Sequence, residues 1–378
     1  MIRNKFIFFT ILFFLFAFIS CSNTASPEIT ISGELKNVPN NKVLLTLEED
    51  INRKKSRVIA EISLDQNGRF KFDRDLVPNI YSLKINDKKS VTLALDRGQN
   101  VVISGDAADS KTIKVAGSDD TAKLEAYEKF RQESLKRLVI SVRNQIKELK
   151  EKNTPESDPK MVELSRLELE NYDKHKDEMI EFVKKEMGAS IAIYPTSVRW
   201  DGEKNIPFLN ELAKQFEAKH PDLAITEKVK EKVRILTNNS LGGQVAEISM
   251  PDKNDQIIPL SSIKGKLILI DFWGSWCAPC RRESTELSEL YQKYQPKGFE
   301  IYGVALESEK ESWLKAIEHD KRVWTNVASF TEFETPTAFD YAVTSLPANF
   351  LIDENGKVIA KNLHDKELME KLETIFGQ

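Results

Sequence analysis

The segment Leu267–Cys280 (LILIDFWGSWCAPC) constrains the fold of this chain more than any other. Its first residues, Leu267–Ile270, form an uninterrupted apolar run with two β-branched isoleucines, which is the pattern of a strand buried on both faces. The pair Cys277 and Cys280 closes the segment. Apolar residues at helical spacing follow at Leu287, Leu290 and Tyr291. The segment therefore predicts a buried strand that leads through a turn with two cysteines into a helix.

The position of the two cysteines in the first turn of that helix indicates thiol chemistry. Unpaired backbone N–H groups and the positive end of the helix dipole favour an anion there. Such an environment lowers a thiol pKa from about 8.5 into the range of roughly 3.5–7.5. We therefore expect Cys277 to be an exposed attacking thiolate and Cys280 to be the thiol that resolves a mixed disulfide. Pro279 suits an early helical position, where its missing N–H costs little.

Half of a structural zinc site is the alternative interpretation of this cysteine pair. Zinc would need two more cysteine or histidine ligands at comparable spacing. His319 and His364 are isolated in the sequence, and His175 and His220 have charged neighbours that are typical of a surface. We therefore favour the redox interpretation and expect no metal and no other cofactor.

Composition limits the classes of partner. With 30% charged residues and a pI near 5.8, the chain has no basic stripe, and we expect no binding to nucleic acid. The length of 378 residues allows two or three domains. Because two of the three cysteines share one motif, a framework of structural disulfides is excluded.

The segment Asp271–Cys280 resembles the active-site segment of the TlpA/ResA-like thiol-disulfide oxidoreductases of the thioredoxin superfamily. Residues 344–353 resemble the cis-proline loop of that family and its following strand, and residues 354–358 resemble the next hairpin turn. The resemblance covers roughly residues 244–378 and implies a thioredoxin-like α/β fold, in a domain that we place at residues 241–378. Ala348 stands where the family commonly has threonine, and Asp271 stands where many TlpA-like members have asparagine.

The motif and the resemblance together give the expected site. The catalytic residues are Cys277, Cys280, Asp271 and Pro347, the last as the proline beside the disulfide. The residues expected to contact substrate are Trp276, Ala278, Pro279 and Leu346. Asp271 follows the apolar strand, so partial burial should raise its pKa and suit it to proton transfer with Cys280, although a surface carboxylate is the alternative. Glu307 is either a second carboxylate near the site or a solvated side chain.

The rest of the chain predicts two further regions, so the expected fold is multidomain. Residues 28–118 predict a small all-β sandwich or barrel with seven short strands. Residues 119–240 have helical periodicity, with two long apolar stripes separated by Pro155 and Pro159 that indicate a helical hairpin. The β region resembles the domain that precedes the thioredoxin-like domain in many such lipoproteins. A scaffold or docking role and a simple spacer are both open for it.

The N-terminus predicts export. Arg3 and Lys5 precede the apolar run Phe6–Ile19, which is shorter than a membrane span of about 20 residues and is typical of a secretory signal. The tail AFISC, which ends at Cys21, resembles a bacterial lipoprotein processing site. We expect a signal peptide at residues 1–20, lipidation of Cys21 and a tether at residues 21–27, with cleavage elsewhere as the alternative. The expected location is the cell envelope of a Gram-negative bacterium, with a lipid anchor in the membrane, facing the periplasm.

The resemblance implies a thiol-disulfide oxidoreductase that reduces client proteins through a Cys-Ala-Pro-Cys dithiol. Its partners would be clients with disulfides or paired thiols, apocytochromes c during cytochrome c maturation among them, and a membrane thiol electron donor. The alternative is a binding or scaffold lipoprotein with an ancillary redox domain. A peroxidase fits less well, because its peroxidatic cysteine normally lies in a threonine-containing loop well before the second cysteine.

Overall fold

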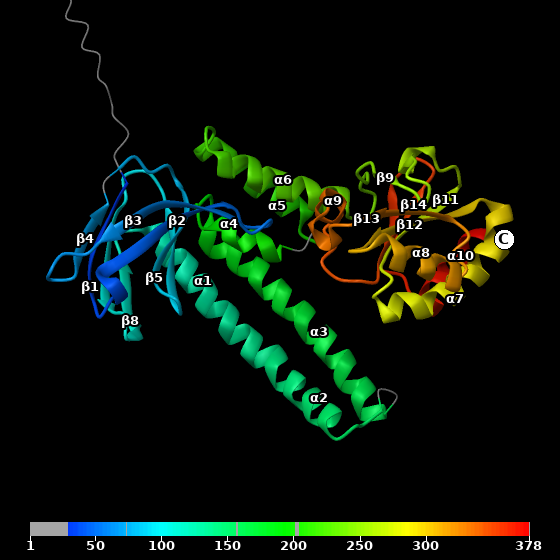
Figure 1. Cartoon of the computed structure of the whole chain (residues 1–378), viewed down its shortest axis with the longest axis horizontal. Helices are drawn as coiled ribbons and strands as arrows, with labels where there is room; N and C mark the ends of the chain where they lie inside the picture. Colours follow the sequence, from blue (N-terminus) through cyan, green and yellow to red (C-terminus); the bar gives the residue numbers. More distant parts are fainter. Residues whose placement is uncertain (1–28, 73, 156–157, 201–203, 378) are drawn as a thin grey trace, which may run out of the picture.

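The computed structural model describes residues 29–72, 74–155, 158–200 and 204–377, and Figure 1 shows their arrangement. The expected signal peptide, the tether and Cys21 lie outside the described residues. Across the described ranges, no helix is long and apolar enough to cross a lipid bilayer.

Strands form the N-terminal part of the described chain. One sheet has the strand order β4-β1-β7-β8, and a second has the order β3-β2-β5-β6. Their bounds are β1 Thr30–Lys36, β2 Lys42–Asp50, β3 Lys55–Ser63, β4 Arg69–Phe72, β5 Asn79–Asn86, β6 Lys89–Leu95, β7 Asn100–Asp106 and β8 Asp109–Ala116. Apolar side chains from both sheets, such as Ile31, Leu45 and Ile103, are buried in one common core. The prediction that this part consists of strands is confirmed.

The sequence pattern does not predict β8, so the expected number of seven strands is too low. Strand β8 lies at the edge of its sheet, and little of the protein packs on either of its faces. Only Ile113 and Val115 are partly covered, and the other residues of β8 are exposed. An edge strand of this kind shows no sustained apolar alternation.

A long helical hairpin follows the strands, as predicted. Helix α1 (Asp119–Leu135) continues through a π-helical turn into α2 (Ser141–Glu151), and α3 (Pro159–Phe182) returns alongside (Figure 1). Side chains cap the starts of α1 and α3: Ser118 accepts from the N–H of Thr121, and Asp158 accepts from the N–H groups at the start of α3. These caps satisfy backbone donors that a helix start leaves unpaired.

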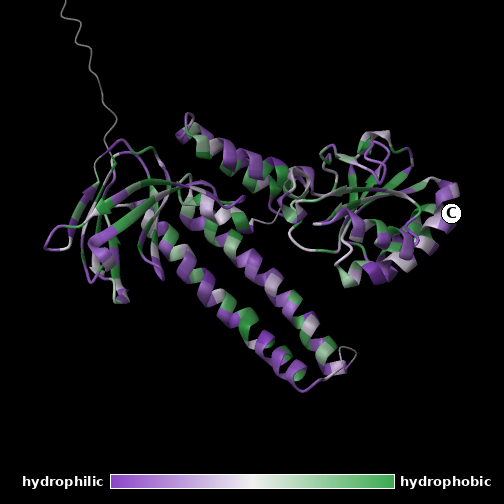
Figure 2. Cartoon of the chain, viewed as in Figure 1, coloured by the Kyte–Doolittle hydropathy of each residue, from purple (hydrophilic) through white to green (hydrophobic). Residues whose placement is uncertain are grey.

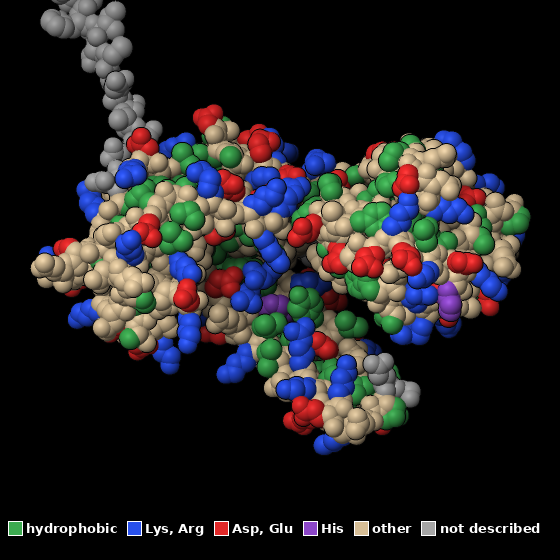
Figure 3. Space-filling model, in the orientation of Figure 1, with side chains coloured by type: hydrophobic (Ala, Val, Ile, Leu, Met, Phe, Trp, Pro, Cys, Tyr) green, Lys and Arg blue, Asp and Glu red, His purple; other side chains and the backbone are tan. Residues whose placement is uncertain are grey.

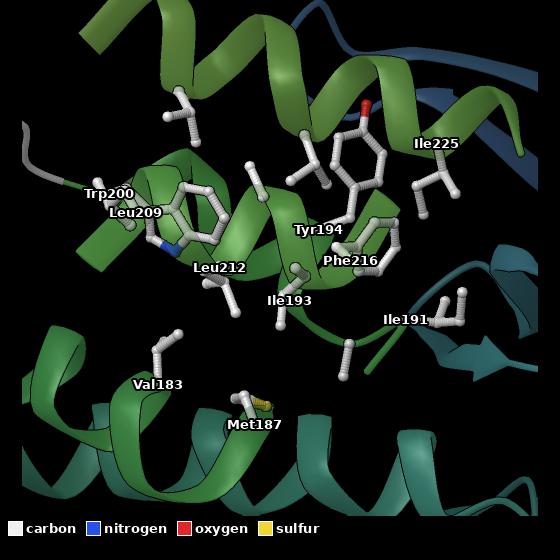
Figure 4. Packing of buried hydrophobic residues seen from close by; sticks show 14 of the residues in the cluster. Val183, Met187, Ile191, Ile193, Tyr194, Trp200, Leu209, Leu212, Phe216 and Ile225 are labelled. Atoms are coloured by element: carbon white, nitrogen blue, oxygen red, sulfur yellow. The ribbon is translucent and has the colours of Figure 1, made fainter. Parts of the chain in front are cut away.

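Three further helices, α4 (Ile193–Thr196), α5 (Ile206–Lys219) and α6 (Ala224–Asn238), complete this region. Figure 4 shows the core that they share with the end of α3, to which Tyr194 and Phe216 contribute their rings. The apolar segment 188–195, which has no evident role in the sequence, runs into this core: Ile191 and Ile193 have no exposed surface. Its role is therefore packing.

Two histidines that the sequence places at the surface are buried. His175 is 4% exposed, and its Nδ1 lies 2.8 Å from the hydroxyl of Ser134. His220 is 1% exposed, and its Nε2 lies 3.1 Å from the carbonyl oxygen of Ala189. Their charged neighbours Lys174 and Lys219 are exposed, so the character of the adjacent residues does not show that the histidines are buried.

The C-terminal part is a mixed sheet with helices packed against it. The strand order is β13-β12-β11-β14-β15, in which β11, β12 and β13 are parallel and β14 and β15 are antiparallel to their neighbours. The strands are β11 Leu267–Trp273, β12 Phe299–Leu306, β13 Thr325–Ser329, β14 Ala348–Asp353 and β15 Val358–Lys361, and a hairpin of β9 Ser249–Pro251 and β10 Ile257–Pro259 precedes them. The helices are α7 Ala278–Tyr294, α8 Lys310–His319, α9 Pro336–Asp340 and α10 Asp365–Phe376.

The central strand β11 is buried at every residue. Leu267 and Leu269 pack with residues of α7 and α10, whereas Ile268 and Ile270 pack in a second core with β9 and the segment after α9. Figure 2 shows the apolar strands of this sheet beside helices with polar outer faces. The predicted strand, turn and helix around the two cysteines are therefore confirmed.

The C-terminal sheet is attached to the rest of the chain through defined contacts. The side chain of Asn239, after α6, donates to the carbonyl oxygen of Asp340 at 2.7 Å. The guanidinium of Arg53, in the β2–β3 turn, lies 4.9 Å from the ring centroid of Phe339. A cavity of about 430 Å³ lies between the helical hairpin, α6 and β15, and Figure 3 shows the hollow between the two lobes of the molecule.

Candidate active site

The two cysteines lie at the start of α7, directly after the buried strand β11. Cys277 is the N-cap residue of α7, and its sulfur accepts from the backbone N–H of Cys280 at 3.3 Å. The two sulfurs form a disulfide with Cα atoms 5.3 Å apart. Pro279 occupies the first turn of α7, as expected. The structure thus places the sulfur of Cys277 where a helix start favours negative charge.

Cys277 is less accessible than the sequence predicts. In the disulfide form it is 4% exposed and Cys280 is 2% exposed. Both pack with Trp273, Trp313 and neighbouring small residues in one apolar cluster. The prediction of an exposed sulfur is therefore wrong for this state, because side chains from β11 and α8 cover the disulfide.

The residues expected to contact substrate surround this covered disulfide. Trp276 is 50% exposed, whereas Trp273 is fully buried. The indole N–H of Trp276 donates to the carbonyl oxygen of Leu306 at 2.9 Å, and its ring meets the edge of Phe333. The other expected contact residues are the exposed Ala278 and Pro279 and the partly buried Leu346.

The Leu346–Pro347 peptide bond is cis, as predicted. Ala348 opens β14 and is paired with Phe272 of β11, which sets the proline loop beside the turn that carries the cysteines. Leu346 packs against the apolar cluster that contains Cys277 and Cys280. The tertiary fold therefore joins two segments that are about 70 residues apart in the sequence.

Asp271 is 3% exposed, so the alternative of a surface carboxylate is excluded. It forms an ion pair with Arg322, which is also 3% exposed. Burial raises the pKa of Asp271, and the positive charge of Arg322 opposes that rise. Sequence reasoning missed Arg322, which lies in the connection between α8 and β13 outside any motif. The available signal was indirect: a carboxylate predicted to be buried needs a cationic or hydrogen-bonding partner.

Glu307 is 1% exposed, which rules out the solvated alternative. Its carboxylate accepts from the backbone N–H of Ser275 at 2.5 Å and from the Ser275 hydroxyl at 2.8 Å. Burial raises the pKa of Glu307, and these two hydrogen bonds oppose the rise. Because Ser275 lies two residues before Cys277, Glu307 holds the turn that leads into α7.

His364 forms a further polar contact near the site. Its Nδ1 lies 2.9 Å from a carboxylate oxygen of Glu283 on α7. The hydrogen bond to Glu283 raises the pKa of His364, against the effect of burial. Among the residues that the structure describes, no group of three or more His, Cys, Asp or Glu side chains could hold a metal ion.

The chain is similar to characterised families over this part. Residues 241–361 match the AhpC/TSA family. The thiol-disulfide oxidoreductase ResA of a Bacillus cereus strain is 34% identical over 153 residues, which are 38% of this chain and 78% of that protein. ResA of Bacillus subtilis (strain 168) is 31% identical over 120 residues, which are 32% of this chain and 65% of that protein.

Solved structures also match this part of the chain. The thioredoxin domain of a thiol-disulfide oxidoreductase from Bacteroides vulgatus is 33% identical, covers 36% of this chain and 97% of that chain, and has a TM-score of 0.35. A thiol-disulfide oxidoreductase from Bacteroides fragilis is 30% identical, covers 35% and 98% of the two chains, and has a TM-score of 0.34. Given the disulfide at the start of α7, the adjacent cis-proline and the identity to ResA, the chain belongs to the ResA-like thiol-disulfide oxidoreductases, with a C-terminal thioredoxin-like domain.

Proposed function

We propose that this protein is a lipid-anchored, periplasm-facing thiol-disulfide oxidoreductase that reduces disulfides of client proteins in a Gram-negative cell envelope. The observation that carries the proposal is the position of Cys277 as the N-cap of α7, with the N–H of Cys280 directed at its sulfur. This position favours the thiolate, which is the nucleophile of thiol–disulfide exchange. Asp271 and the Ala278-Pro279 pair resemble those of reducing members of the family, which supports the reducing direction.

The reaction has two exchange steps. The thiolate of Cys277 attacks one sulfur of a client disulfide, which forms a mixed disulfide and releases the other client sulfur as a thiolate. Cys280 then loses its proton to Asp271, and its thiolate attacks the sulfur of Cys277. The Cys277–Cys280 disulfide forms and the client leaves as a dithiol. Two electrons pass from the enzyme to the client.

Each turnover leaves the enzyme oxidised, so a donor must return two electrons. A membrane thiol protein fits this requirement, because the periplasm is an oxidising compartment. Clients would be exported proteins with disulfides or paired thiols, including apocytochromes c, whose cysteines must be reduced before haem attachment. The covered disulfide suggests that a client displaces side chains around Cys277, and the exposed Trp276 lies at the rim of that surface.

Trapping of the mixed disulfide tests the proposal. In the Cys280→Ser variant, resolution is blocked, so client proteins should accumulate as adducts at Cys277 that are visible on non-reducing gels and released by a reductant. The Cys277→Ser variant, which keeps the second thiol, is the matched control and should trap far less. Equal trapping by both variants would reverse the assigned roles, and absence of adducts in both would contradict client reduction.

The direction of electron flow has its own measurement. Equilibration of the dithiol with glutathione buffers gives its reduction potential. We expect a value in the range of reducing family members, near the roughly −270 mV of thioredoxin, whereas a value near the roughly −120 mV of DsbA would indicate an oxidase.

Replacement of Cys21 tests the anchor. Wild-type protein should fractionate with membranes and carry labelled fatty acid, whereas the Cys21→Ser variant should lose the label and be released on disruption of the outer membrane. Retention of the label by that variant would contradict lipidation at Cys21.

A further inference from the structure

The surroundings of Asp271 hold a buried cation that the reaction scheme does not yet use. Asp271 on β11 is paired with Gly303 on β12, and Gly303 is paired with Asn326 on β13, so these residues lie at one level of the sheet. A side chain at Gly303 would crowd the residues that surround the cation. A Cβ atom there would lie 2.6 Å from Oδ1 of Asn326 and 3.3 Å from the indole nitrogens of Trp273 and Trp324.

The side chain of Arg322 lies among these residues. Its guanidinium pairs with Asp271 and lies 3.8 Å from the ring centroid of Trp273 and 4.9 Å from that of Trp324. It donates to Oδ1 of Asn326 at 3.3 Å and to the hydroxyl of Ser284 at 2.5 Å. The Ser284 hydroxyl in turn donates to the carbonyl oxygen of Cys280 at 3.1 Å. One side chain thus connects the buried carboxylate to the backbone of the second cysteine.

We propose that Arg322 is a positioning residue that keeps Asp271 ionised, so that Asp271 can accept the proton of Cys280 during resolution of the mixed disulfide. The inference rests on the proposed function and deepens it. A buried carboxylate without a cation would be protonated at neutral pH and could not accept a second proton. An arginine is suited to this task because it stays protonated under all working conditions.

The rings of Trp273 and Trp324 stabilise the guanidinium of Arg322 while Asp271 is protonated. When Asp271 accepts the proton, Arg322 becomes a buried cation without its counter-charge, which would be strongly unfavourable in an apolar environment. The faces of Trp273 and Trp324 stabilise a desolvated cation through cation–π attraction, and the oxygens of Ser284 and Asn326 accept its hydrogen bonds. The carboxylate can therefore cycle between its charged and neutral forms without expelling the guanidinium.

Other charged groups face this pair from neighbouring elements. Glu283 on α7 and His364 before α10 act on Asp271 with opposite signs and are bonded to each other at 2.9 Å. Asp320, after α8, faces Arg322 and is itself paired with Arg281. Because these groups have partners of opposite charge, Arg322 is the cation that acts most directly on Asp271.

The pH dependence of the resolution step tests the inference in the full-length protein. Reduced enzyme is mixed with excess 2-hydroxyethyl disulfide, a neutral probe, and conversion of the mixed disulfide at Cys277 to the Cys277–Cys280 disulfide is followed by acid quench and mass spectrometry. The wild-type rate should rise with pH as Asp271 ionises. Arg322→Met removes the cation at similar volume, raises the pKa of Asp271 and should move this rise upward by at least about one pH unit.

Further variants separate positioning from folding. Arg322→Lys keeps the charge and should return the rise toward its wild-type pH. Combining Arg322→Met with Asp271→Asn should slow resolution little more than Asp271→Asn alone, because the proton acceptor is then already absent. Arg282→Met, an exposed arginine in the same first turns of α7, is the matched control and should leave the profile unchanged.

Two results would overturn the inference. One is a wild-type pH profile in Arg322→Met, after correction for the folded fraction from circular dichroism, because Arg322 would then be structural only. The other is an unchanged profile in Asp271→Asn. Neither result bears on client reduction itself, which depends on the Cys280→Ser adducts described above.

Discussion

Asp271 and Glu307, the two buried carboxylates of the site, have different partners. Asp271 faces the guanidinium of Arg322, whereas Glu307 accepts hydrogen bonds from the neutral Ser275. Burial raises the pKa of both, but only Asp271 has an ion-pair partner in direct contact among the described residues. The difference suits Asp271 to proton transfer and Glu307 to holding the turn before Cys277.

Glu307 gives a prediction at this scale. Because its pKa is raised on folding, the folded state binds more protons than the unfolded state at pH values above the ordinary glutamate pKa of 4.5. The stabilisation that Glu307 contributes is therefore fully present below pH 4.5. It is lost as the pH rises through the pKa of Glu307 in the folded state. Gln at position 307 keeps an acceptor for Ser275 but cannot ionise.

We therefore expect the Glu307→Gln variant to gain stability relative to wild type as the pH rises from 4 to 8, measured by urea unfolding. Glu309→Gln, at an exposed position two residues later, is the control and should show no such trend. A constant difference between Glu307→Gln and wild type across this pH range would contradict the assigned shift.

The start of α1 shows how helices are attached to sheets in this chain. Ser118 accepts from the N–H of Thr121 at 2.9 Å and donates to the carbonyl oxygen of Ala94 at 2.7 Å. Thr121 accepts from the N–H of Ala94 at 3.0 Å and donates to the same carbonyl oxygen at 2.9 Å. Ala94 belongs to β6, an edge strand, so the helix cap also satisfies backbone groups that the sheet leaves unpaired.

Ser118→Ala should therefore destabilise the protein by about 1–2 kcal/mol, because it removes a helix cap and leaves a buried carbonyl oxygen with one fewer donor. Ser141→Ala, on the exposed face of the same long helix, should change stability by less than about 0.5 kcal/mol. Chemical denaturation of both variants checks this expectation, and equal effects would refute the assigned role of the cap.

Contacts of Arg53 join the three parts of the molecule. Its guanidinium pairs with Asp50 in the same turn and with Glu231 on α6, and it lies over the ring of Phe339 in α9. The side chain is 26% exposed, so water weakens its ion pairs. The main effect of the Arg53 contacts is therefore on orientation. They hold the thioredoxin-like domain against the N-terminal strands and the helices.

Arg53→Met should loosen that attachment with a modest loss of stability, on the order of 1 kcal/mol. We expect faster hydrogen exchange in α9 and around residues 239–243, with unchanged exchange in β11. Arg57→Met, which removes an exposed ion pair of β3 with Glu49, should leave the exchange pattern as in wild type. Protection of α9 that does not change in Arg53→Met would contradict the proposed attachment.

The sequence alone identifies the parts whose signal is local. The apolar run before Asp271 predicts β11, and the spacing of Cys277 and Cys280 predicts a disulfide at a helix start. Pro347, followed by an apolar strand, indicates the cis-proline loop through resemblance to the family. Helical and alternating periodicities locate most other elements because each records one face that must be buried.

Only the tertiary structure reveals contacts between segments that are distant in the chain. Arg322 lies 51 residues from Asp271, and nothing in its own sequence context distinguishes it from an exposed arginine. The burial of His175 and Glu307 and the cover over Cys277 likewise depend on which elements meet. Periodicity specifies which side of a strand or helix faces inward, but the partner of a buried charge is decided by packing in three dimensions.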